Sequence, residues 1–482
     1  MHYRATLKPL GYLLWVLAAS QLFPLALALA ENQGTYSTAR GFLTSIAASL
    51  ILGTILWLAG RRSEAQLHRK EGLFIVAFTW LLGGLLGSLP FVLSGAIPSP
   101  LDAIFESVSG FTTTGASILT DIEVLPRSIL LWRSLTHWLG GGGIVILFVA
   151  ILPSLGIGGK HLYRIEATGP TVTGLQSRAV DTARTLWLIY TSISVLEFLF
   201  LWLGGMPVFD AVCHTFGTVA TGGFSTKNAS IAYYGTYFQV VITIFMFMCG
   251  VNFSLYYQWV KRKFLVFRDS EFKLYACIFL LGVVCLFTGQ FATGSASFWT
   301  ALRESTFVVA SISTSTGYVT ADYEQWPVFS QGFLVLLMFF GASAGSTSGG
   351  MKVVRLLILV RMGLRMAVQA FRPSSVLPLR LGGVPIDREI EEQVAGFALL
   401  YMGWVVAGTM VLMLFGHDLV TSFVAPLTCI ANIGPGLGLV GPTDNYAAIH
   451  PVAKGFLALL MVVGRLEVMA ITVLFVPSFW RR

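Results

Sequence analysis

The sequence predicts an all-α integral membrane protein, and three observations lead to that fold class. Of the 482 residues, 55% are hydrophobic and only 11% are charged, whereas soluble domains carry about 25% charged residues. Apolar stretches long enough to cross a bilayer recur along the whole chain. Four segments rich in glycine and threonine separate them at intervals of about 100 residues. Together these features predict a polytopic protein with an internal repeat.

The apolar stretches predict ten membrane spans. The first is interpreted as a retained helix, although it ends in Ala28-Leu29-Ala30, which imitates a signal-peptide cleavage site. The expected spans lie near residues 10–30, 41–60, 72–95, 128–155, 182–205, 236–260, 272–292, 328–360, 394–416 and 452–477.

The distribution of charge predicts the orientation of these spans. Alternate loops are rich in Lys and Arg, and such loops are retained on the cytoplasmic side. The intervening loops, 31–40, 96–128, 205–232, 294–328 and 417–450, carry four cations against eleven acids, a net charge of −7 in a chain of net charge +8. Both termini are therefore expected in the cytoplasm.

Four of the outer loops share one internal order: a short amphipathic stretch, then Thr or Ser, then Gly. Aligned on Gly115, Gly222, Gly317 and Gly434, they recur at intervals of 107, 95 and 117 residues. Each predicted unit is a span, a re-entrant half-helix, a glycine turn and a second span. The expected organisation is residues 1–70 for two N-terminal helices and a basic loop, followed by units at 71–160, 180–263, 270–370 and 390–482.

Four glycine turns at membrane depth favour a cation site. Irregular backbone is tolerated there only when it is buried in protein or lines a water-filled cavity. Rings of backbone carbonyls can replace the hydration shell of a monovalent cation, and glycine permits the strained dihedral angles that aim successive carbonyls the same way. The alternative is that these small residues only allow close helix contacts; four segments in register with the spans favour the cation site.

The sequence resembles the Trk/Ktr/HKT potassium transporters over essentially the whole chain. The motifs are Thr112-Thr113-Thr114-Gly115, Ala220-Thr221-Gly222-Gly223, Thr314-Ser315-Thr316-Gly317, Asn432-Ile433-Gly434-Pro435-Gly436 and Gly464-Arg465-Leu466-Glu467. The resemblance implies four M1-P-M2 repeats (helix, pore helix and loop, helix) in pseudo-fourfold arrangement around one pore, plus two extra N-terminal helices. It also implies a selectivity filter related to the TVGYG loop of potassium channels, less strict because the four loops differ.

The expected filter comprises sixteen residues whose backbone carbonyls face the ion. They are Thr112, Thr113, Thr114 and Gly115; Val219, Ala220, Thr221 and Gly222; Thr314, Ser315, Thr316 and Gly317; and Ala431, Asn432, Ile433 and Gly434. The K⁺ ion is expected at Thr113, Thr114, Ala220, Thr221, Ser315, Thr316, Asn432 and Ile433.

The segment 341–352 should interrupt the eighth span, because each glycine costs a helix about 1 kcal/mol relative to alanine. By resemblance it is an intramembrane gating loop; the alternative is a passive kink. Lys352 would either donate to loop carbonyls or extend to the membrane interface. The expected gate residues are Gly341, Gly345, Ser346, Thr347, Gly349, Gly350, Lys352 and Arg465.

Arg465 lies within the last predicted span, where an unpaired charge usually faces an interior cavity. The resemblance implies a cationic barrier beneath the filter; the alternative is an interhelical salt bridge. Six acids are expected to line the outer mouth: Asp102, Glu106, Asp210, Asp322, Glu324 and Asp418. The four glycines at 140–143 are expected to permit close helix packing, because no phosphate-binding signature follows them.

The predicted function is the potassium-translocating subunit of a bacterial K⁺ uptake system in the inner membrane. K⁺ is the transported ion, and no cofactor or nucleic acid is expected on this chain, since no nucleotide-binding signature occurs. The resemblance implies a cytoplasmic NAD- and ATP-binding regulatory subunit of the TrkA type, docked on the basic loops, and a homodimer.

Three alternatives remain open at this point. A proton- or sodium-coupled K⁺ symporter with alternating access commonly has an ionisable residue inside a span, and Glu197 and His137 are the candidates. In the plant branch of the family, a serine in place of the first filter glycine accompanies sodium preference, so Gly115 favours potassium. A membrane-embedded enzyme would need clustered catalytic groups, and the sequence shows none within its spans.

Overall fold

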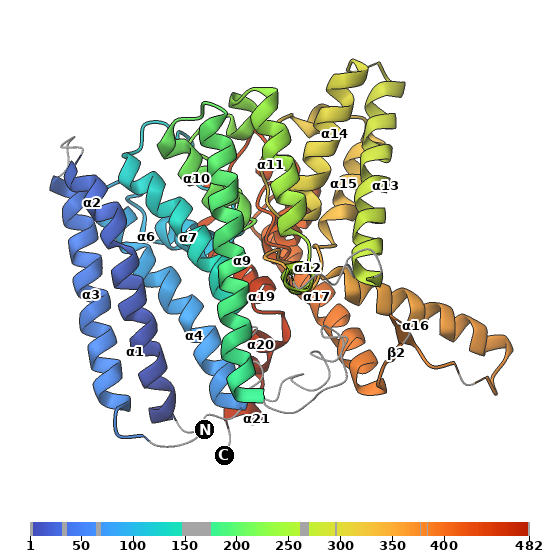
Figure 1. Cartoon of the computed structure of the whole chain (residues 1–482), viewed down its shortest axis with the longest axis horizontal. Coiled ribbons are helices and arrows are strands. Elements are labelled where there is room, and N and C mark those ends of the chain that lie inside the picture. Colours follow the sequence, from blue (N-terminus) through green and yellow to red (C-terminus); the bar gives the residue numbers. More distant parts are fainter. Residues whose placement is uncertain are drawn as a thin grey trace.

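The computed structural model describes residues 3–30, 36–63, 69–146, 175–260, 269–294, 296–375, 377–382 and 384–480. Its described part is helical except for one short antiparallel hairpin, β1 (Arg380–Leu381) with β2 (Val384–Pro385). The predicted basic segments within 147–174 and 261–268, and Arg481-Arg482, lie outside the described residues. The N-terminal end of α1 (Tyr3–Ser20) and α21 (Pro477–Trp480) lie at the same end of the molecule (Figure 1).

The first helices form a separate group at one side of the molecule (Figure 1). α1 packs along α3 (Tyr36–Gly60), and both contact α2 (Leu22–Ala30) and α4 (Arg69–Gly87). Gly11 and Gly53 permit the close approach of α1 and α3, since a Cβ on Gly11 would lie 2.6 Å from the carbonyl oxygen of Gly53. α5 (Leu89–Leu93) follows α4 after a break at Ser88.

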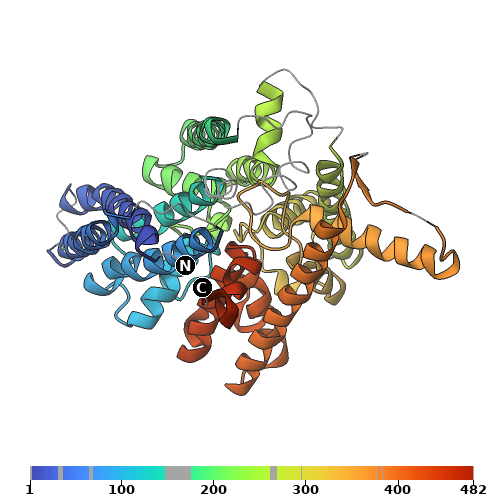
Figure 2. The same ribbon diagram turned by 90° about the horizontal axis from the view of Figure 1, so that it is seen from below.

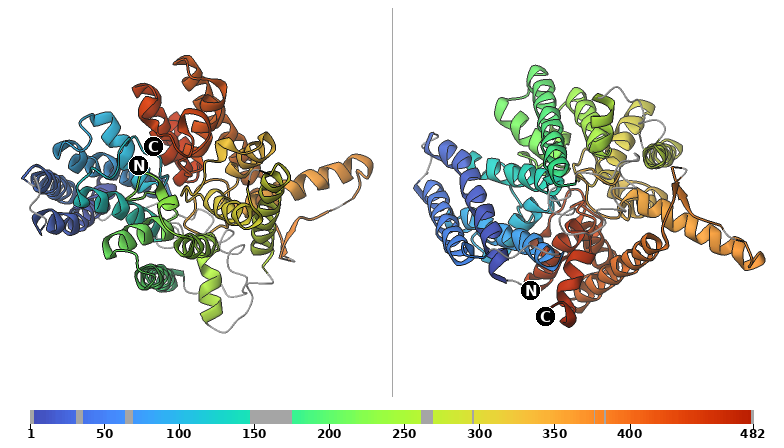
Figure 3. Two further views of the ribbon diagram at one scale, coloured as in Figure 1. Left: turned by 90° about the horizontal axis from the view of Figure 1, so that it is seen from above. Right: turned by 60° about the horizontal axis from the view of Figure 1, so that its bottom comes forward.

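Four units follow around a common centre, in sequence order (Figures 2 and 3). Each contains a long helix, a short helix and a further helix. The long helices are α4, α9 (Leu175–Leu203), α13 (Ser270–Ala292) and α17 (Arg388–Leu414). The short helices are α6 (Pro100–Phe111), α10 (Val208–Val219), α14 (Phe298–Ser313) and α18 (Leu419–Ile430). The helices that follow them are α7 (Arg127–Ile146), α11 (Thr236–Cys249), α15 (Val328–Met338) and α19 (Pro451–Arg465).

The contacts of the four short helices are cyclic. Each packs against the long helix before it and the helix after it, and also against the last helix of a neighbouring unit: α6 on α19, α10 on α7, α14 on α11 and α18 on α15. Three of the four begin with a side-chain cap, from Ser99, Ser297 and Asp418, which satisfies an otherwise free backbone amide.

The predicted spans are less regular than expected. Among the described residues, six helices are long and apolar enough to cross a membrane, and two bent pairs raise that number to eight. The span expected at 236–260 turns by 92° between α11 and α12 (Phe253–Val260), and the span expected at 452–477 turns by 116° between α19 and α20 (Met469–Thr472). The 328–360 span is divided into α15 and α16 (Val353–Phe371), and the 128–155 span extends beyond the described end of α7.

The outer surface of the long helices is apolar. Ile51 on α3, Leu281 on α13 and Leu399 on α17 are 62%, 54% and 75% exposed. Contiguous exposed apolar surface of this kind would aggregate in water and is stable in a bilayer. α16 extends away from the bundle (Figures 1–3).

Candidate functional site

Four loops of identical backbone geometry follow the four short helices. We define L1 as Thr112–Gly115, L2 as Ala220–Gly223, L3 as Thr314–Gly317 and L4 as Ala431–Gly434. In each, the second residue and the fourth have positive φ: Thr113 and Gly115, Thr221 and Gly223, Ser315 and Gly317, Asn432 and Gly434. The third amide of each donates to the carbonyl five residues earlier, at 2.7–2.9 Å. The four loops therefore share one conformation.

This geometry corrects the predicted register of L2. The glycine equivalent to Gly115, Gly317 and Gly434 is Gly223, whereas Gly222 is equivalent to Thr114, Thr316 and Ile433. Val219 is the last residue of α10 and lies before the loop. The predicted set Val219–Gly222 was thus displaced by one residue, so the L2 residues equivalent to Thr113 and Thr114 are Thr221 and Gly222 and not the predicted Ala220 and Thr221. The sequence alignment was wrong because Gly222-Gly223 offers two glycines and only the dihedral angles distinguish them.

The four loops form a closed ring. A Cβ added to the last glycine of any loop would overlap a carbonyl oxygen of the next loop. The pairs of glycine and carbonyl are Gly115 with Gly222, Gly223 with Thr316, Gly317 with Ile433, and Gly434 with Thr114. Each terminal glycine thus packs against the third carbonyl of the next loop. Because these glycines also have φ between +77° and +91°, both the dihedral angle and the close approach require glycine.

Side chains divide the loops into two kinds. In L1 and L3, two threonine hydroxyls bond to each other, Thr112 to Thr114 at 2.8 Å and Thr314 to Thr316 at 2.7 Å. At the same first and third positions, L2 has Ala220 and Gly222 and L4 has Ala431 and Ile433, so neither loop has this pair of hydroxyls. Asn432 links the ends of the ring, since its Nδ2 donates to Thr114 Oγ1 and to the Met461 carbonyl, both at 2.9 Å.

A cavity of about 180 Å³ lies on one side of the ring. L1, L2 and L3 reach it through their terminal glycines Gly115, Gly223 and Gly317, and Pro435, directly after L4, also lines it. The acid that lines it is Asp444, which is exposed, and two cations, Arg133 and Lys227, also line it. Asp444 is not among the six acids predicted for the outer mouth. Its position after the fourth loop, among glycine and proline, was the available signal.

None of the six acids predicted for the outer mouth lines this cavity. Asp102 forms an ion pair with Lys454, and Asp210 accepts a hydrogen bond from Thr226 at 2.7 Å. Glu324 accepts from the amide of Gly438 at 2.5 Å. Asp322 and Asp418 cap short helices. A hydrogen bond from the Thr421 side chain, together with those from nearby backbone amides, keeps the pKa of Asp418 below its usual value. These acids therefore stabilise the loops.

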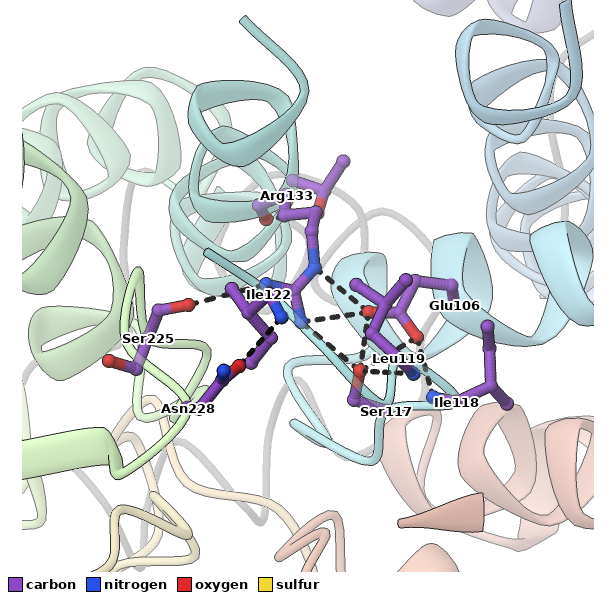
Figure 4. Close-up of polar contacts among 9 residues, drawn as sticks. Glu106, Ser117, Ile118, Leu119, Ile122, Arg133, Ser225 and Asn228 are labelled. Atoms are coloured by element: carbon purple, nitrogen blue, oxygen red, sulfur yellow. Dashed lines mark hydrogen bonds and ion pairs between the residues drawn. The ribbon is translucent and has the colours of Figure 1, made fainter. Parts of the chain in front are cut away.

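Glu106 is the clearest of these corrections. It is fully buried on α6 and pairs with Arg133 of α7 at 2.8 Å. Its carboxylate also accepts from Ser117 Oγ and the Ile118 amide, while Arg133 donates to the Ser225 carbonyl at 3.3 Å (Figure 4). The pair thus fixes the chain that leaves L1 and the chain that leaves L2. The sequence places Glu106 in an outer loop, where it was predicted to line the mouth. Only the fold shows that Arg133 lies beside it.

The 341–352 segment lies against the opposite side of the ring. It is non-helical from the end of α15 to the start of α16, which is more than a kink. The amide of Gly349 donates to Ser315 Oγ of L3 at 2.8 Å, and Thr347 Oγ1 donates to the Val219 carbonyl at 3.1 Å. Gly349 and Gly350 pack on L4, since Cβ atoms there would contact Asn432 and Ala431.

Three neighbouring elements also hold this segment. Glu271, at the start of α13, accepts from the Ala344 amide at 2.7 Å and the Val354 amide at 3.1 Å. The α11–α12 turn pairs with it through Ser343 N to Gly250 O and Phe253 N to Gly345 O, at 3.0 and 3.1 Å. Lys352 is buried and donates to the Ser348 carbonyl, so it does not extend to the interface. Gly341 approaches Gly349 inside the segment.

Arg465 is the last residue of α19 and not the middle of a span. Its Nη1 donates to the Thr347 carbonyl at 2.6 Å and its Nη2 to the Gly140 carbonyl at 3.0 Å. Within the described part of the chain Arg465 forms no interhelical salt bridge; Glu467 pairs instead with Arg355 of α16. Glu467 and Val468 have positive φ, which turns the chain away after α19.

Both candidate coupling residues are buried. Glu197 on α9 and His137 on α7 are fully enclosed, and neither lines the cavity. The glycines of α7 permit the close packing expected of them: a Cβ on Gly140 would overlap the Phe111 carbonyl, and one on Gly141 would lie 2.8 Å from Ala220.

The fold and the site define an all-helical, multi-pass membrane protein built around a ring of four backbone loops. The chain belongs to the TrkH family of cation transport proteins, whose family model matches residues 39–482. It is therefore a transporter and not an enzyme.

The similarity extends over the full length of known relatives. The chain is 38% identical over 487 residues to the Trk system potassium uptake protein TrkH of Salmonella typhimurium, covering 100% of both. It is 34% identical over 486 residues to TrkG of Escherichia coli, covering 100% of this chain and 99% of that protein. The crystal structure of the potassium transporter TrkH from Vibrio parahaemolyticus matches with a TM-score of 0.91 at 33% identity, covering 100% of each chain.

Proposed function

We propose that this chain is the potassium-translocating subunit of a bacterial K⁺ uptake system. The observation that carries the proposal is the closed ring of L1–L4, in which four backbone segments of one conformation surround a common centre. Stacked carbonyls from such segments can replace the hydration shell of K⁺. Support comes also from relatives that are named potassium uptake proteins over the same length.

The ion would be held by the backbone carbonyls of the four loops, with L2 in its corrected register. L1, L3 and L4 contribute the residues predicted for them, and L2 contributes Ala220, Thr221, Gly222 and Gly223. The short helices end at these loops, so the partial negative charge of their C-termini favours a cation at the centre. The four units, near 71–160, 180–263, 270–370 and 390–482, would form one pseudo-fourfold pore beside the N-terminal helices.

The 341–352 segment would be the gate. It packs directly against L3 and L4 and is tied to Arg465, so an ion leaving the ring meets both a backbone obstacle and a positive charge. Opening the path requires that these hydrogen bonds break together. Glycines and serines make such a movement sterically easy.

The cytoplasmic face would receive the regulatory subunit. α16 carries Arg361 and Arg365, is followed directly by Arg372, and begins at the end of the 341–352 segment, so a partner that moves α16 would move the gate. Its protrusion and its exposed Leu364, Met366 and Phe371 also suit contact with a second copy of the chain. We propose a nucleotide-binding partner of the TrkA type, a homodimer, and an inner-membrane location with both termini cytoplasmic.

The test is flux in liposomes. Purified protein would be reconstituted, and Rb⁺ or K⁺ uptake measured under an imposed potential, with and without a pH or Na⁺ gradient. Uptake that follows the K⁺ electrochemical gradient alone supports the proposal. Uptake driven by either other gradient would instead identify a symporter, and absence of K⁺ flux would contradict the proposal.

A further inference from the structure

Gly222 differs from the other glycines of the ring. Its φ is not positive, so its backbone conformation is open to any residue. The equivalent positions of the other loops carry side chains, Thr114, Thr316 and Ile433, all of them buried. The lack of a side chain at Gly222 therefore has a cause outside the loop.

That cause is the imidazole of His137. A Cβ built on Gly222 would overlap the ring, with Nδ1, Cε1 and Cγ as its three nearest atoms. His137 comes from α7, on the neighbouring unit, and its ring stacks on Phe224 at 4.1 Å between centroids. The guanidinium carbon of Arg133 also lies over Phe224, 4.1 Å from the centroid of its ring. The imidazole thus has a fixed position directly behind L2.

The ring nitrogens of His137 do not explain its burial. Neither Nδ1 nor Nε2 has a hydrogen-bond partner among the described residues, although the side chain is fully buried. A buried polar group without a partner normally costs free energy. The imidazole can therefore influence L2 through its stacking on Phe224 and its contact with Gly222.

We propose that His137 is a positioning residue of the ring, which takes the place behind L2 that a loop side chain occupies in L1, L3 and L4. It sets where the Gly222 carbonyl lies and thereby contributes to discrimination among monovalent cations. This inference depends on the proposed function, because it assigns a role within the cation-binding ring.

The experiment is a rescue. Gly222→Ala should reduce K⁺ uptake about tenfold, since overpacking a close contact is strongly unfavourable. His137→Ala added to Gly222→Ala should restore uptake to within about threefold of the original protein, because the added methyl then has room. Gly223→Ala is the matched control: its φ is +83° and its Cβ would meet the Thr316 carbonyl, so His137→Ala should not rescue it.

Two outcomes would overturn the inference: a double variant no better than Gly222→Ala, or full activity in Gly222→Ala alone. If Gly222→Ala does not fold, His137→Ala alone provides the test. This variant should be stable enough to purify, and its K⁺/Na⁺ permeability ratio, measured from reversal potentials, should fall. An unchanged ratio would contradict the role of His137. If Gly223→Ala also leaves flux and selectivity intact, the proposed cation-binding ring itself fails.

Discussion

Arg465 donates a hydrogen bond of 2.6 Å from Nη1 to the carbonyl oxygen of Thr347, 118 residues away in the sequence. The same guanidinium bonds the carbonyl of Gly140 in α7. One side chain therefore ties the 341–352 segment to the first and the last of the four units. Both acceptors are neutral carbonyls, so these two hydrogen bonds do not neutralise the positive charge.

Arg465→Ala should raise cation flux about tenfold or more. Hydrogen bonds to charged groups contribute about 1.5–3 kcal/mol each, and a change of about 1.4 kcal/mol in the closed state shifts a population tenfold. Rb⁺ uptake into proteoliposomes measures the effect. Arg465→Gln retains amide donors without the charge and should give a smaller rise. Unchanged or reduced uptake in a well-folded Arg465→Ala protein would contradict the role in gating.

Glu271→Ala should also increase flux, because the amides of Ala344 and Val354 lose their common acceptor. Each unsatisfied buried amide costs about 1–3 kcal/mol, which destabilises the packed arrangement of the 341–352 segment. Uptake without any regulatory subunit is the measurement. Lys273→Ala, an exposed change on the same helix, is the control and should behave as the original protein. Equal flux in both variants would remove Glu271 from the gate.

Gly317→Ala should abolish K⁺ selectivity or flux. Its φ is +80° and a Cβ would overlap the Ile433 carbonyl, so the ring must distort. Gly416→Ala provides the same strain without the contact, since its φ is +81° and nothing lies within 4 Å. The control should lose about 1–2 kcal/mol of stability and keep its selectivity. Reversal potentials in K⁺, Rb⁺ and Na⁺ distinguish the two; matching behaviour would argue against the ring.

Glu106→Ala should lower thermal stability substantially, because removing one partner of a buried ion pair costs about 3–5 kcal/mol. The variant leaves Arg133 buried and releases Ser117 and Ile118 beyond L1. Arg388→Ala, which breaks the exposed pair with Glu392, should cost less than about 1 kcal/mol. Thermal denaturation followed by size-exclusion chromatography reports both. Equal midpoints would mean that the Glu106 pair is not structurally important.

Asp444→Asn should weaken K⁺ uptake at low ionic strength. Asp444 lines the cavity beside the ring, and one charge near the ion path contributes about 1 kcal/mol at 4 Å in water, or about fivefold in local K⁺ concentration. Added inert salt should remove the difference, because it screens exposed charges. Asp418→Asn preserves the helix cap away from the cavity and should have no such effect. A salt-independent loss at Asp444 would indicate a structural role instead.

The amino-acid sequence by itself determined the membrane class, the approximate positions of most helices and the four glycine loops. These features are local: apolar runs need no distant partner to be recognised, and a glycine that must adopt positive φ identifies its own turn. It also located the break in the eighth span, because glycine and serine disfavour helix wherever they occur.

Only the tertiary structure decided what contacts what. The register of L2 depends on a ring whose closing contact joins Asn432 to Thr114, 318 residues apart, and Glu106 is buried because Arg133 of another helix lies beside it. The bend after Gly250 follows from pairing with the 341–352 segment. Arg465 is positioned by the carbonyl of Gly140, and His137 by its contact with Gly222; both partners are distant in the sequence. Such relationships arise from packing in three dimensions, which has no local signature in the chain.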